Sequence, residues 1–266
     1  MSFFNQDLNQ KFEDYYGSIY GARWPLLRES LLSPVKAVPF NRGLKKPYMM
    51  DRASIIAAES LRLPESGLVL DACAAPGGKS LVLVSRMKDS STLVSNEFSA
   101  ERRRRLSKVL DEHLAEDKRR QIKITGFNAA RLGRKKSICY DAILLDVPCS
   151  SERHVITDKK ALEQWTPARP RFLCARQWSL LSAAFLILKE GGSLVYSTCA
   201  ISAAENDGVV SRLLKKYGSR VIMDEPDFSE SGILIGEKTQ YGRIMLPDQC
   251  GGSGPMYVAR FGKSPS

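Results

Sequence analysis

The segment LVLDACAAPGGKS, residues 68–80, places a short apolar strand directly before a glycine-containing loop. Gly77 and Gly78 let the backbone approach a ligand closely and lead into a helix that we expect over residues 79–87. The loop carries neither the glycine fingerprint of dinucleotide-binding folds nor the full phosphate loop, because the first glycine is missing. A nicotinamide-dependent dehydrogenase is therefore disfavoured.

Beyond this segment, predicted strands and helices alternate. The pattern predicts further strands over residues 92–95, 121–125, 141–146, 193–197, 220–223 and 256–261. It predicts helices over residues 100–113, 172–189 and 203–217, the second of them ended by Gly191 and Gly192. Such alternation is typical of βαβ units, so we expect an α/β fold with a mostly parallel, doubly wound sheet of seven strands.

The first 62 residues differ in character from the remainder. Aromatic residues between Phe3 and Trp24 have spacings compatible with an amphipathic helix around residues 6–17. Residues 33–47, with three prolines and one glycine, predict an irregular linker. A helix is expected over residues 51–62 with Asp51 as its N-cap. We therefore predict a helical N-terminal extension, residues 1–62, and a main domain, residues 63–266.

Positive charge is concentrated in one part of the chain. The 266 residues include 40 Lys and Arg against 29 Asp and Glu, a formal net charge of +11. Residues 101–136 alone hold 13 basic and 5 acidic residues. Such a run is typical either of a solvated helix face or of a surface that binds a polyanion such as nucleic acid. Hydrophobic residues make up 43% of the chain, which excludes wholesale disorder.

Cysteine and histidine usage bears on metals and on compartment. Six Cys without a C-x-x-C pair, and only two His, are typical of free thiols in a reducing compartment and predict no metal site. The N-terminal sequence MSFFNQDLNQKFEDYYG resembles neither a secretory signal nor a transit peptide, so we expect a cytoplasmic location. No run of 18 apolar residues occurs, so we expect no membrane partner.

Three loops follow predicted strands at the edge where such sheets bind ligands. Besides the glycine loop, Glu97 follows the second of these strands and suits the two ribose hydroxyls of an adenosine ligand. Asp146 and Cys149 follow the strand over residues 141–146, and Cys199 follows the strand over residues 193–197. The two thiols either face one cavity beside the ligand or are ordinary buried cysteines.

Together, three segments resemble the RsmB/Nop2/Sun family of S-adenosylmethionine-dependent RNA cytosine-5 methyltransferases. They are DACAAPGGKS (71–80), LLDVPCSSERH (144–154) and VYSTCAISAAEND (195–207), and the resemblance covers roughly residues 48–262. It implies a Rossmann-like class I methyltransferase fold. The form PCSSERH and the segment YYGSIYGARWPLLRESLL (15–32) look most like compact NSUN-type members found in mitochondria, one of which methylates ribosomal RNA. A mitochondrial location is therefore the alternative.

The resemblance implies an S-adenosylmethionine site around the glycine loop. Glu97 would bind the ribose hydroxyls with Arg102 nearby, and Asn128 stands where the family usually has Asp beside the adenine. Asp146 would line the same site. The backbone that would hold the methionine part of the cofactor belongs to Cys73, Ala74, Ala75, Pro76, Gly77, Gly78 and Lys79.

The resemblance also implies the catalytic roles. Cys199 would attack C6 of the cytosine, because C5 is a poor nucleophile until a thiolate has added to the ring. Cys149 would assist release of the product. Asp146 would hydrogen-bond the N3/N4 edge of the base. Lys79 would either lower a thiol pKa or serve a structural role.

The resemblance implies RNA as the substrate, and because the base must be unstacked to enter such a pocket, the target cytosine should be single-stranded or flipped out. Ribosomal RNA is the leading target. Transfer RNA, or a catalytically silent role in RNA binding or ribosome assembly, is the alternative. The chain lacks the separate RNA-binding domains of larger family members, so either its basic surface suffices or a protein partner or ribosomal subunit presents the RNA to an otherwise monomeric enzyme. Phosphate contacts are expected from the basic segment and from Arg153, Arg169, Arg171 and Arg176.

Overall fold

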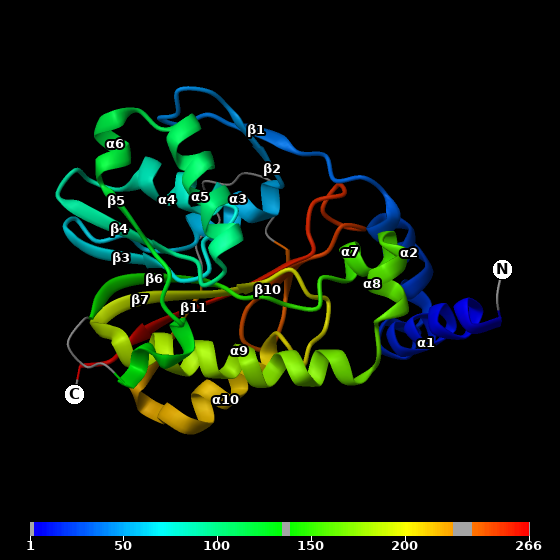
Figure 1. The fold of residues 1–266 in the computed structure, drawn as a ribbon. Coiled ribbons are helices and arrows are strands. Elements are labelled where there is room, and N and C mark those ends of the chain that lie inside the picture. Colours follow the sequence, from blue (N-terminus) through cyan, green and yellow to red (C-terminus); the bar gives the residue numbers. More distant parts are fainter. Residues whose placement is uncertain (1–2, 135–138, 226–235, 266) are drawn as a thin grey trace.

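A nine-stranded sheet forms the centre of the molecule (Figure 1), in a computed structural model that describes residues 3–134, 139–225 and 236–265. The strand order is β5-β4-β3-β6-β7-β11-β10-β9, with β8 also paired to β11. Five neighbouring strands are parallel: β5 (Ile122–Thr125), β4 (Ser91–Asn96), β3 (Gly67–Asp71), β6 (Tyr140–Asp146) and β7 (Leu188–Thr198). The remaining strands join by antiparallel pairing: β11 (Met256–Lys263) pairs with β7, β8 (Val221–Asp224) and β10 (Arg243–Met245) pair with β11, and β9 (Glu237–Lys238) pairs with β10.

The predicted mostly parallel, doubly wound α/β sheet is confirmed, and all seven predicted strands are present. Side chains of the central strands alternate between two apolar cores: Leu70 and Ile143 face one, Val69 and Leu144 the other. The two short strands β9 and β10 extend the sheet beyond the prediction. Strands of two and three residues carry too little hydrophobic pattern to be recognised.

Helices cover both faces of this sheet (Figure 1). One layer contains α3 (Arg52–Glu59), α4 (Gly78–Arg86) and α5 (Ala100–His113). The other contains α9 (Ala168–Ile187), α10 (Asp207–Tyr217) and the short helix η2 (Ala129–Arg134). Asp51 caps α3 by accepting a hydrogen bond from the Ala53 amide, 2.9 Å, as predicted. Two further short helices are α6 (Glu116–Arg120), which precedes β5, and η3 (Gly218–Arg220), which precedes β8.

The predicted end of the long helix is wrong. α9 ends at Ile187, and Gly191 and Gly192 lie inside β7, next to an irregularity in its pairing with β6. A Cβ at position 192 would come within 2.8 Å of the Asp141 carbonyl, so this close approach requires glycine. Lys263 serves the helix end instead, because its Nζ donates to the carbonyls of Leu186 and Leu188 at 3.3 and 2.6 Å.

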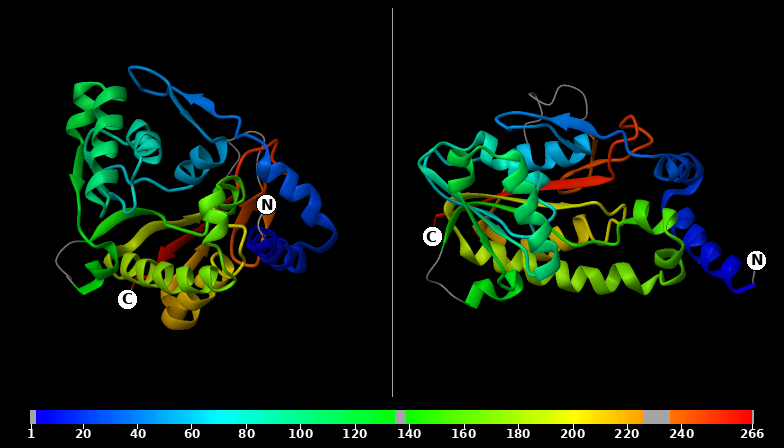
Figure 2. Two further views of the ribbon diagram at one scale, coloured as in Figure 1. Left: turned by 45° about the vertical axis from the view of Figure 1, so that its right-hand side comes forward. Right: turned by 45° about the horizontal axis from the view of Figure 1, so that its top comes forward.

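Four helices gather at one end of the molecule in both figures of the whole chain (Figure 1, Figure 2). They are α1 (Phe3–Tyr20), α2 (Trp24–Leu32), α7 (Glu152–Thr157) and α8 (Lys159–Glu163), with the 3-10 turn η1 (Gly21–Arg23) joining the first two. A cluster of buried aromatic rings holds them together: Phe12, Tyr16, Trp24 and Trp165. The predicted N-terminal helix is therefore packed against later elements.

Residues 33–47 are less irregular than predicted. β1 (Val38–Phe40) pairs antiparallel with β2 (Tyr48–Met50), forming a small second sheet. The prolines that suggested a linker include Pro39, which sits within β1 on a two-stranded ribbon where proline is tolerated. No helix among the described residues combines the length and apolarity needed to cross a membrane.

Candidate active site

The strand order reverses between β3 and β6, and the loops after these strands and after β7 meet at one edge of the sheet. Ligands of open α/β sheets bind at such a point. The structure brings Lys79, Asp146, Cys149 and Cys199 together there from three loops. Residues far apart in the sequence thus form one site because their strands are neighbours.

The glycine loop needs its glycines for packing as well as for conformation. Gly77 has a φ of 121°, a conformation that side chains rarely adopt. A Cβ on Gly78 would lie 2.8 Å from the ring of Tyr48 on β2. The loop is therefore pressed between the body of the domain and the small β1–β2 sheet, with its backbone close to the site.

Two cavities open on either side of this loop and share Cys73. The Lys79 cavity has a volume of about 230 Å³ and the Glu97 cavity about 300 Å³. The Lys79 cavity is lined by Tyr48, Met49, Met50, Ser54, Asp71, Cys73, Ala74, Ala75, Pro76, Gly78, Lys79 and Asp146. The Glu97 cavity includes Asn96, Glu97, Phe98, Arg102, Asn128, Pro148, Arg176 and Ser179 in its lining.

Glu97 and Arg102 form a connected pair in the Glu97 cavity. Glu97 Oε1 accepts a hydrogen bond from the Ser99 amide at 2.9 Å, and Arg102 lies 3.2 Å from Oε2. Arg102 also donates to the Ala75 carbonyl at 2.9 Å, which ties the acid to the glycine loop. Glu97 Oε2 is buried and accepts no well-aligned hydrogen bond within the described residues. This oxygen is available to a hydroxyl donor.

Asn128 lies in the lining of the Glu97 cavity. Its Oδ1 accepts a hydrogen bond from the Ala130 amide at 3.1 Å, which fixes the side chain at the start of η2. The neighbouring Asn96, to which sequence reasoning gave no role, is buried and bridges two loops. Its Nδ2 donates to the carbonyls of Ala72 and Phe127, at 3.0 and 3.2 Å.

Asp71 stands at the end of β3 beneath the glycine loop. Ser80 Oγ donates to its Oδ2 at 2.6 Å, while Oδ1 has no partner among the described residues. Burial raises the pKa of Asp71 to about 7, although the hydrogen bond from Ser80 opposes this shift. The residue is thus protonated in part near neutral pH.

Lys79 and Asp146 form an ion pair, with Nζ 2.8 Å from Oδ2. Ser54 Oγ accepts a second hydrogen bond from Lys79 at 3.3 Å, and Ser197 Oγ donates to Asp146 Oδ1 at 2.9 Å. Burial acts to lower the pKa of Lys79, but the Asp146 carboxylate outweighs it and the net shift is upward. Lys79 therefore keeps its positive charge in the site.

Cys149 and Cys199 face each other, with their Sγ atoms 2.9 Å apart. The Cys199 amide also donates to Cys149 Sγ at 3.3 Å, and Ser151 Oγ lies 3.1 Å from Cys199 Sγ. Ser151 was missed by the sequence reasoning; it reaches the thiol from a left-handed backbone conformation with φ of 55°. The one sequence signal for Ser151 was its place in the segment LLDVPCSSERH, residues 144–154.

The two thiols have opposite titration behaviour. The hydrogen bond from Cys149, assisted by Ser151, lowers the pKa of Cys199 even though burial opposes the shift. The hydrogen bond to Cys199, together with burial, raises the pKa of Cys149. Of the pair, Cys199 is therefore the more acidic thiol and Cys149 the less acidic one. A third cysteine, Cys73, lines both the Glu97 and the Lys79 cavity, and burial raises its pKa to about 12.

The basic segment divides between two edges of the sheet. Arg102 lines the Glu97 cavity, and Arg104 and Arg105 are exposed in the first turns of α5. Residues 118–120 on α6 lie instead at the opposite edge, where β5 begins, and form ion pairs with acids. The α5 arginines of this segment therefore lie at the site and its α6 residues do not, while Lys135 and Lys136 lie outside the described residues.

Arg153 was expected to contact phosphate, and this expectation is wrong. Its guanidinium donates to the carbonyls of Ser30 and Gly252 at distances of 2.9 to 3.0 Å, so it joins α2 to the loop before β11. Arg171 and Arg176 are exposed on α9, with Arg176 at the Glu97 cavity.

Within the described residues no group of three or more His, Cys, Asp or Glu is arranged to hold a metal ion.

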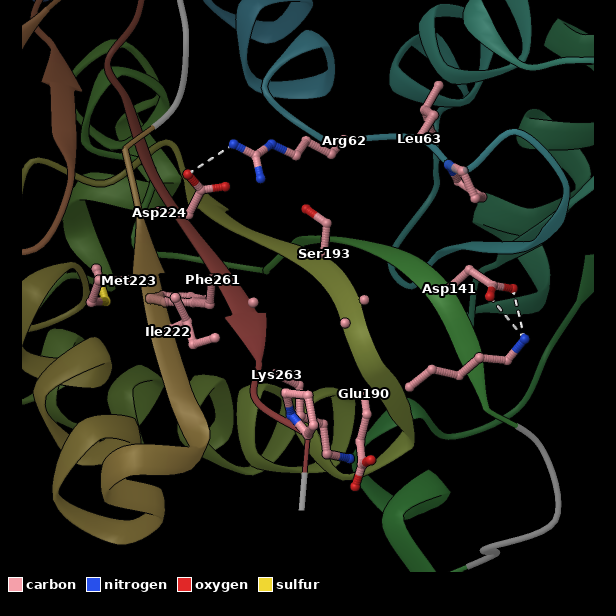
Figure 3. A pocket seen from close by; sticks show the side chains of 16 residues that line it. Arg62, Leu63, Asp141, Glu190, Ser193, Ile222, Met223, Asp224, Phe261 and Lys263 are labelled. Carbon is pink, nitrogen blue, oxygen red and sulfur yellow. Dashed lines mark hydrogen bonds and ion pairs between the residues drawn. The ribbon is translucent and has the colours of Figure 1, made fainter.

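A third cavity of about 460 Å³ lies at the opposite edge of the sheet (Figure 3). Four of its charged side chains form two ion pairs: Arg62 lies 3.2 Å from Asp224, and Lys189 lies 2.8 Å from Asp141. The larger volume therefore does not make it the site, because none of the residues that the loops bring together faces it.

The sheet has the Rossmann-like class I methyltransferase fold, and the two cavities lie at its ligand-binding edge. The chain belongs to the family described as 16S rRNA methyltransferase RsmB/F, whose sequence model matches residues 58–262. The resemblance stated from three loops is thereby confirmed.

Individual relatives agree with this membership. The chain is 32% identical to the 5-cytosine rRNA methyltransferase NSUN4 of Mus musculus, over 84% of this chain and 61% of that protein. It is 30% identical to the tRNA (cytosine(34)-C(5))-methyltransferase, mitochondrial, of the same organism, over 84% of this chain and 66% of the relative. The chain thus spans about 60% of the length of NSUN4.

Solved structures support the fold. NSun6 from Pyrococcus horikoshii superimposes with a TM-score of 0.70 at 24% identity, covering 85% of this chain and 55% of that one. At this level of identity the likeness concerns the fold alone.

Proposed function

We propose that this chain transfers a methyl group from S-adenosylmethionine to C5 of a cytosine in RNA, with ribosomal RNA as the leading target. The observation that carries the proposal is the thiol pair of Cys149 and Cys199, 2.9 Å apart beside the Lys79–Asp146 ion pair. The family description and the name of NSUN4 both refer to rRNA methyltransferases, which supports the choice of substrate.

The two cavities fit the proposed cofactor, which when bound supplies an electrophilic methyl group. The backbone of residues 73–79 would hold the methionine part, since Gly77 and Gly78 bring it to the cavity wall. Glu97 would accept hydrogen bonds from the ribose hydroxyls through Oε2, which accepts no well-aligned hydrogen bond among the described residues, with Arg102 holding the carboxylate in place by an ion pair. Asn128 would meet the adenine edge by hydrogen bonding.

In the proposed reaction the Cys199 thiolate adds to C6 of cytosine, forming a C6–S bond and making C5 nucleophilic. The lowered pKa of Cys199 supports this role, because the thiolate is the attacking species. After methylation C5 loses its proton to a base from solvent, the electrons of the C5–H bond form the C5=C6 double bond, and the C6–S bond breaks with its electron pair returning to Cys199. Cys149, the less acidic thiol, would assist this release by hydrogen bonding to the departing Cys199 thiolate, 2.9 Å away.

Asp146 is proposed to hydrogen-bond the N3/N4 edge of the base and stabilise the charge that develops there. Lys79 and Ser197 hold its two oxygens, so the carboxylate is oriented before the base arrives. The ammonium of Lys79 also favours the nearby Cys199 thiolate. Lys79 therefore has two proposed roles: it orients the Asp146 carboxylate, and its charge favours the Cys199 thiolate.

Transfer RNA is the second candidate substrate, because one relative at 30% identity is named a tRNA methyltransferase. A catalytically silent role is disfavoured, since both thiols and the ion pair are present and arranged. The word mitochondrial in the name of the tRNA relative supports the mitochondrial alternative over the cytoplasmic expectation.

We retain the division into an extension, residues 1–62, and a catalytic domain, residues 63–266, as part of the proposal. The chain would act as a monomer on RNA presented by a ribosomal subunit or by a protein partner. This can be tested with a ribosomal subunit and with protein-free RNA of the same sequence. Modification of the subunit but not of the free RNA would support the presentation of RNA by the subunit.

The proposal is tested by incubating the chain with radiolabelled S-adenosylmethionine and separate pools of rRNA, tRNA and DNA. Label in rRNA is the expected result, and bisulfite mapping then identifies the cytosine. Label in tRNA alone would select the second candidate. Label in DNA alone, or in none of the pools although the cofactor binds, would overturn the proposal.

A further inference from the structure

We propose that Tyr16 and Tyr20 of the N-terminal helix, together with the buried Glu152, are positioning residues for the Cys199 thiol. The inference rests on the proposed function and gives a positioning role to Tyr16 and Tyr20, which lie outside the part of the chain matched by the family, 58–262, and to Glu152, which lies within it.

Both backbone groups of Ile201, two residues after Cys199, are bound by side chains. The Ile201 amide donates to Glu152 Oε2 at 3.0 Å, and Tyr20 donates its hydroxyl hydrogen to the Ile201 carbonyl at 2.7 Å. Residues 200–202 lie outside any helix or strand, so these two bonds replace the ladder that would hold a strand. The nucleophile segment is thus fixed from α7 on one side and α1 on the other.

Glu152 holds the other thiol loop as well. Its Oε1 accepts hydrogen bonds from the Tyr16 hydroxyl, at 2.5 Å, and from Ser150 Oγ, whose residue adjoins Cys149. The side chain is fully buried, where an unpaired carboxylate is strongly disfavoured. One carboxylate therefore joins the segments of Cys149 and Cys199, and a hydroxyl from α1 completes its hydrogen bonding.

A second buried acid supports the same loop from behind. Glu205 Oε2 accepts from the Ser150 amide at 3.0 Å and from Gln177 Nε2 at 2.7 Å. Ser150 is thereby held through its backbone by Glu205 and through its side chain by Glu152. This arrangement leaves the Cys149 loop little freedom to move relative to α9.

The tyrosine hydroxyls can act as fixed supports because α1 is anchored by its rings. The ring of Tyr16 stacks on Trp24, with centroids 5.5 Å apart, and also contacts Trp165 at 5.9 Å. Tyr20 stacks on the same Trp24 at 6.3 Å. Trp24 in turn donates to Glu13 at 2.8 Å. Loss of either hydroxyl would remove a hydrogen bond without removing this packing.

The thiol pair is sensitive to such support. The thiolate form of Cys199 is favoured by hydrogen bonds with Cys149 and Ser151, whose Sγ and Oγ lie 2.9 and 3.1 Å from Cys199 Sγ. A misplacement of about 1 Å in a reacting group costs roughly 100-fold in rate. Loosening residues 199–201 is therefore expected to affect the nucleophile before it affects folding or cofactor binding.

The first experiment compares Tyr16→Phe, Tyr20→Phe and Glu152→Gln with a matched control, Tyr15→Phe. The Tyr15 ring lies in the same cluster, 5.4 Å from Trp165, but no hydrogen bond of its hydroxyl is found in the described part of the chain. We expect kcat to fall roughly 10-fold for each tyrosine variant and roughly 100-fold for Glu152→Gln. The Kd of S-adenosylmethionine and the kcat of Tyr15→Phe should stay within about twofold of wild type.

The second experiment needs no RNA. The rate of alkylation of Cys199 by iodoacetamide, followed by peptide mass spectrometry as a function of pH, reports its thiolate fraction. The midpoint should move to higher pH in Tyr16→Phe and Tyr20→Phe and should not move in Tyr15→Phe. A shifted midpoint in a chain whose wild type transfers no methyl group would support the positioning role and reject the proposed function.

The inference would be overturned by tyrosine variants whose kcat and alkylation profile match those of Tyr15→Phe. It would also be overturned if the fall in kcat were explained fully by a smaller folded fraction or weaker cofactor binding. Should Glu152→Gln fail to fold, the two tyrosine variants decide the question by themselves, because they keep the ring packing.

Discussion

Lys79 Nζ and Asp146 Oδ2 lie 2.8 Å apart, and the two side chains are only 15% and 27% exposed. A pair so shielded from water interacts more strongly than an ion pair on the surface, and removing one partner leaves the other charge poorly compensated. The chemistry of the site is therefore expected to depend on both residues.

We first expect Asp146→Asn and Lys79→Met to lower the single-turnover rate of methyl transfer by roughly 100-fold or more, because a fixed charge beside the base is lost. Lys189→Met is the control, since Lys189 forms a 2.8 Å ion pair with Asp141 at the far edge of the sheet. Its rate should remain within about twofold of wild type. Equal losses in Lys79→Met and Lys189→Met would show that the effect is on stability alone.

The two thiols should differ sharply when removed. Cys199→Ala is expected to abolish both turnover and covalent attachment to RNA, because no nucleophile remains. Cys149→Ala should instead accumulate a protein–RNA adduct, visible as a shifted band on a denaturing gel. Cys174→Ala, on α9, serves as the control and should behave as wild type. An adduct that forms in Cys199→Ala and not in Cys149→Ala would reverse the two roles.

Cofactor binding should respond to Glu97 more than to Asn128. Glu97→Ala removes a charged acceptor and should raise the Kd of S-adenosylmethionine roughly 10- to 100-fold, as hydrogen bonds to charged groups contribute about 1.5–3 kcal/mol. Asn128→Asp introduces the residue usual in the family and should change the Kd less than tenfold. Calorimetric titration measures both, and a larger effect at position 128 would contradict this assignment.

Salt should weaken RNA binding and leave cofactor binding nearly unchanged. Arg104 and Arg105 are exposed at the site edge of α5, so the double change to Ala should reduce the slope of log affinity against log salt by about 1.4 for single-stranded RNA. The matched control replaces Arg119 and Arg120, which lie at the opposite edge and pair with Asp111 and Glu116. If both double variants lose the same slope, RNA covers the α6 edge as well.

The stability of the protein should fall as pH rises from about 4.5 to 7. Burial, reinforced by the nearby Glu152 charge, raises the pKa of Glu205 to about 7, against 4.5 for the free group. In this window the folded state keeps a proton that the unfolded state has released, so the free energy of unfolding decreases with pH by about 3 kcal/mol from this residue.

Urea titrations at several pH values check this expectation, with Glu205→Gln as the comparison. The variant should lose part of the slope, while Asp71, whose pKa is also raised by burial to about 7, retains a contribution of the same sign. Parallel curves for wild type and Glu205→Gln would contradict a raised pKa at this position.

Local patterns explain what was predictable. Apolar runs identified seven strands, and the glycine loop and two cysteine motifs placed the candidate site because such loops share one edge of a parallel sheet. Interactions between distant segments were not predictable. Lys263 binds a carbonyl at the end of α9, and Ser151 contacts Cys199, only because the fold brings these distant residues together. Arg153 looked like a phosphate contact because a sequence shows its charge but not its partners, Ser30 and Gly252.

The position of β11 has a consequence for how the chain folds during synthesis. This strand follows every other strand in the sequence, yet it inserts beside β7, where Tyr257 pairs with Thr198, the neighbour of Cys199. A nascent chain that stops before Met256 leaves that edge of β7 unpaired and open to aggregation. Completion of the sheet beside Cys199 is thus a late event in biosynthesis, and interrupted translation products are expected to be prone to clearance.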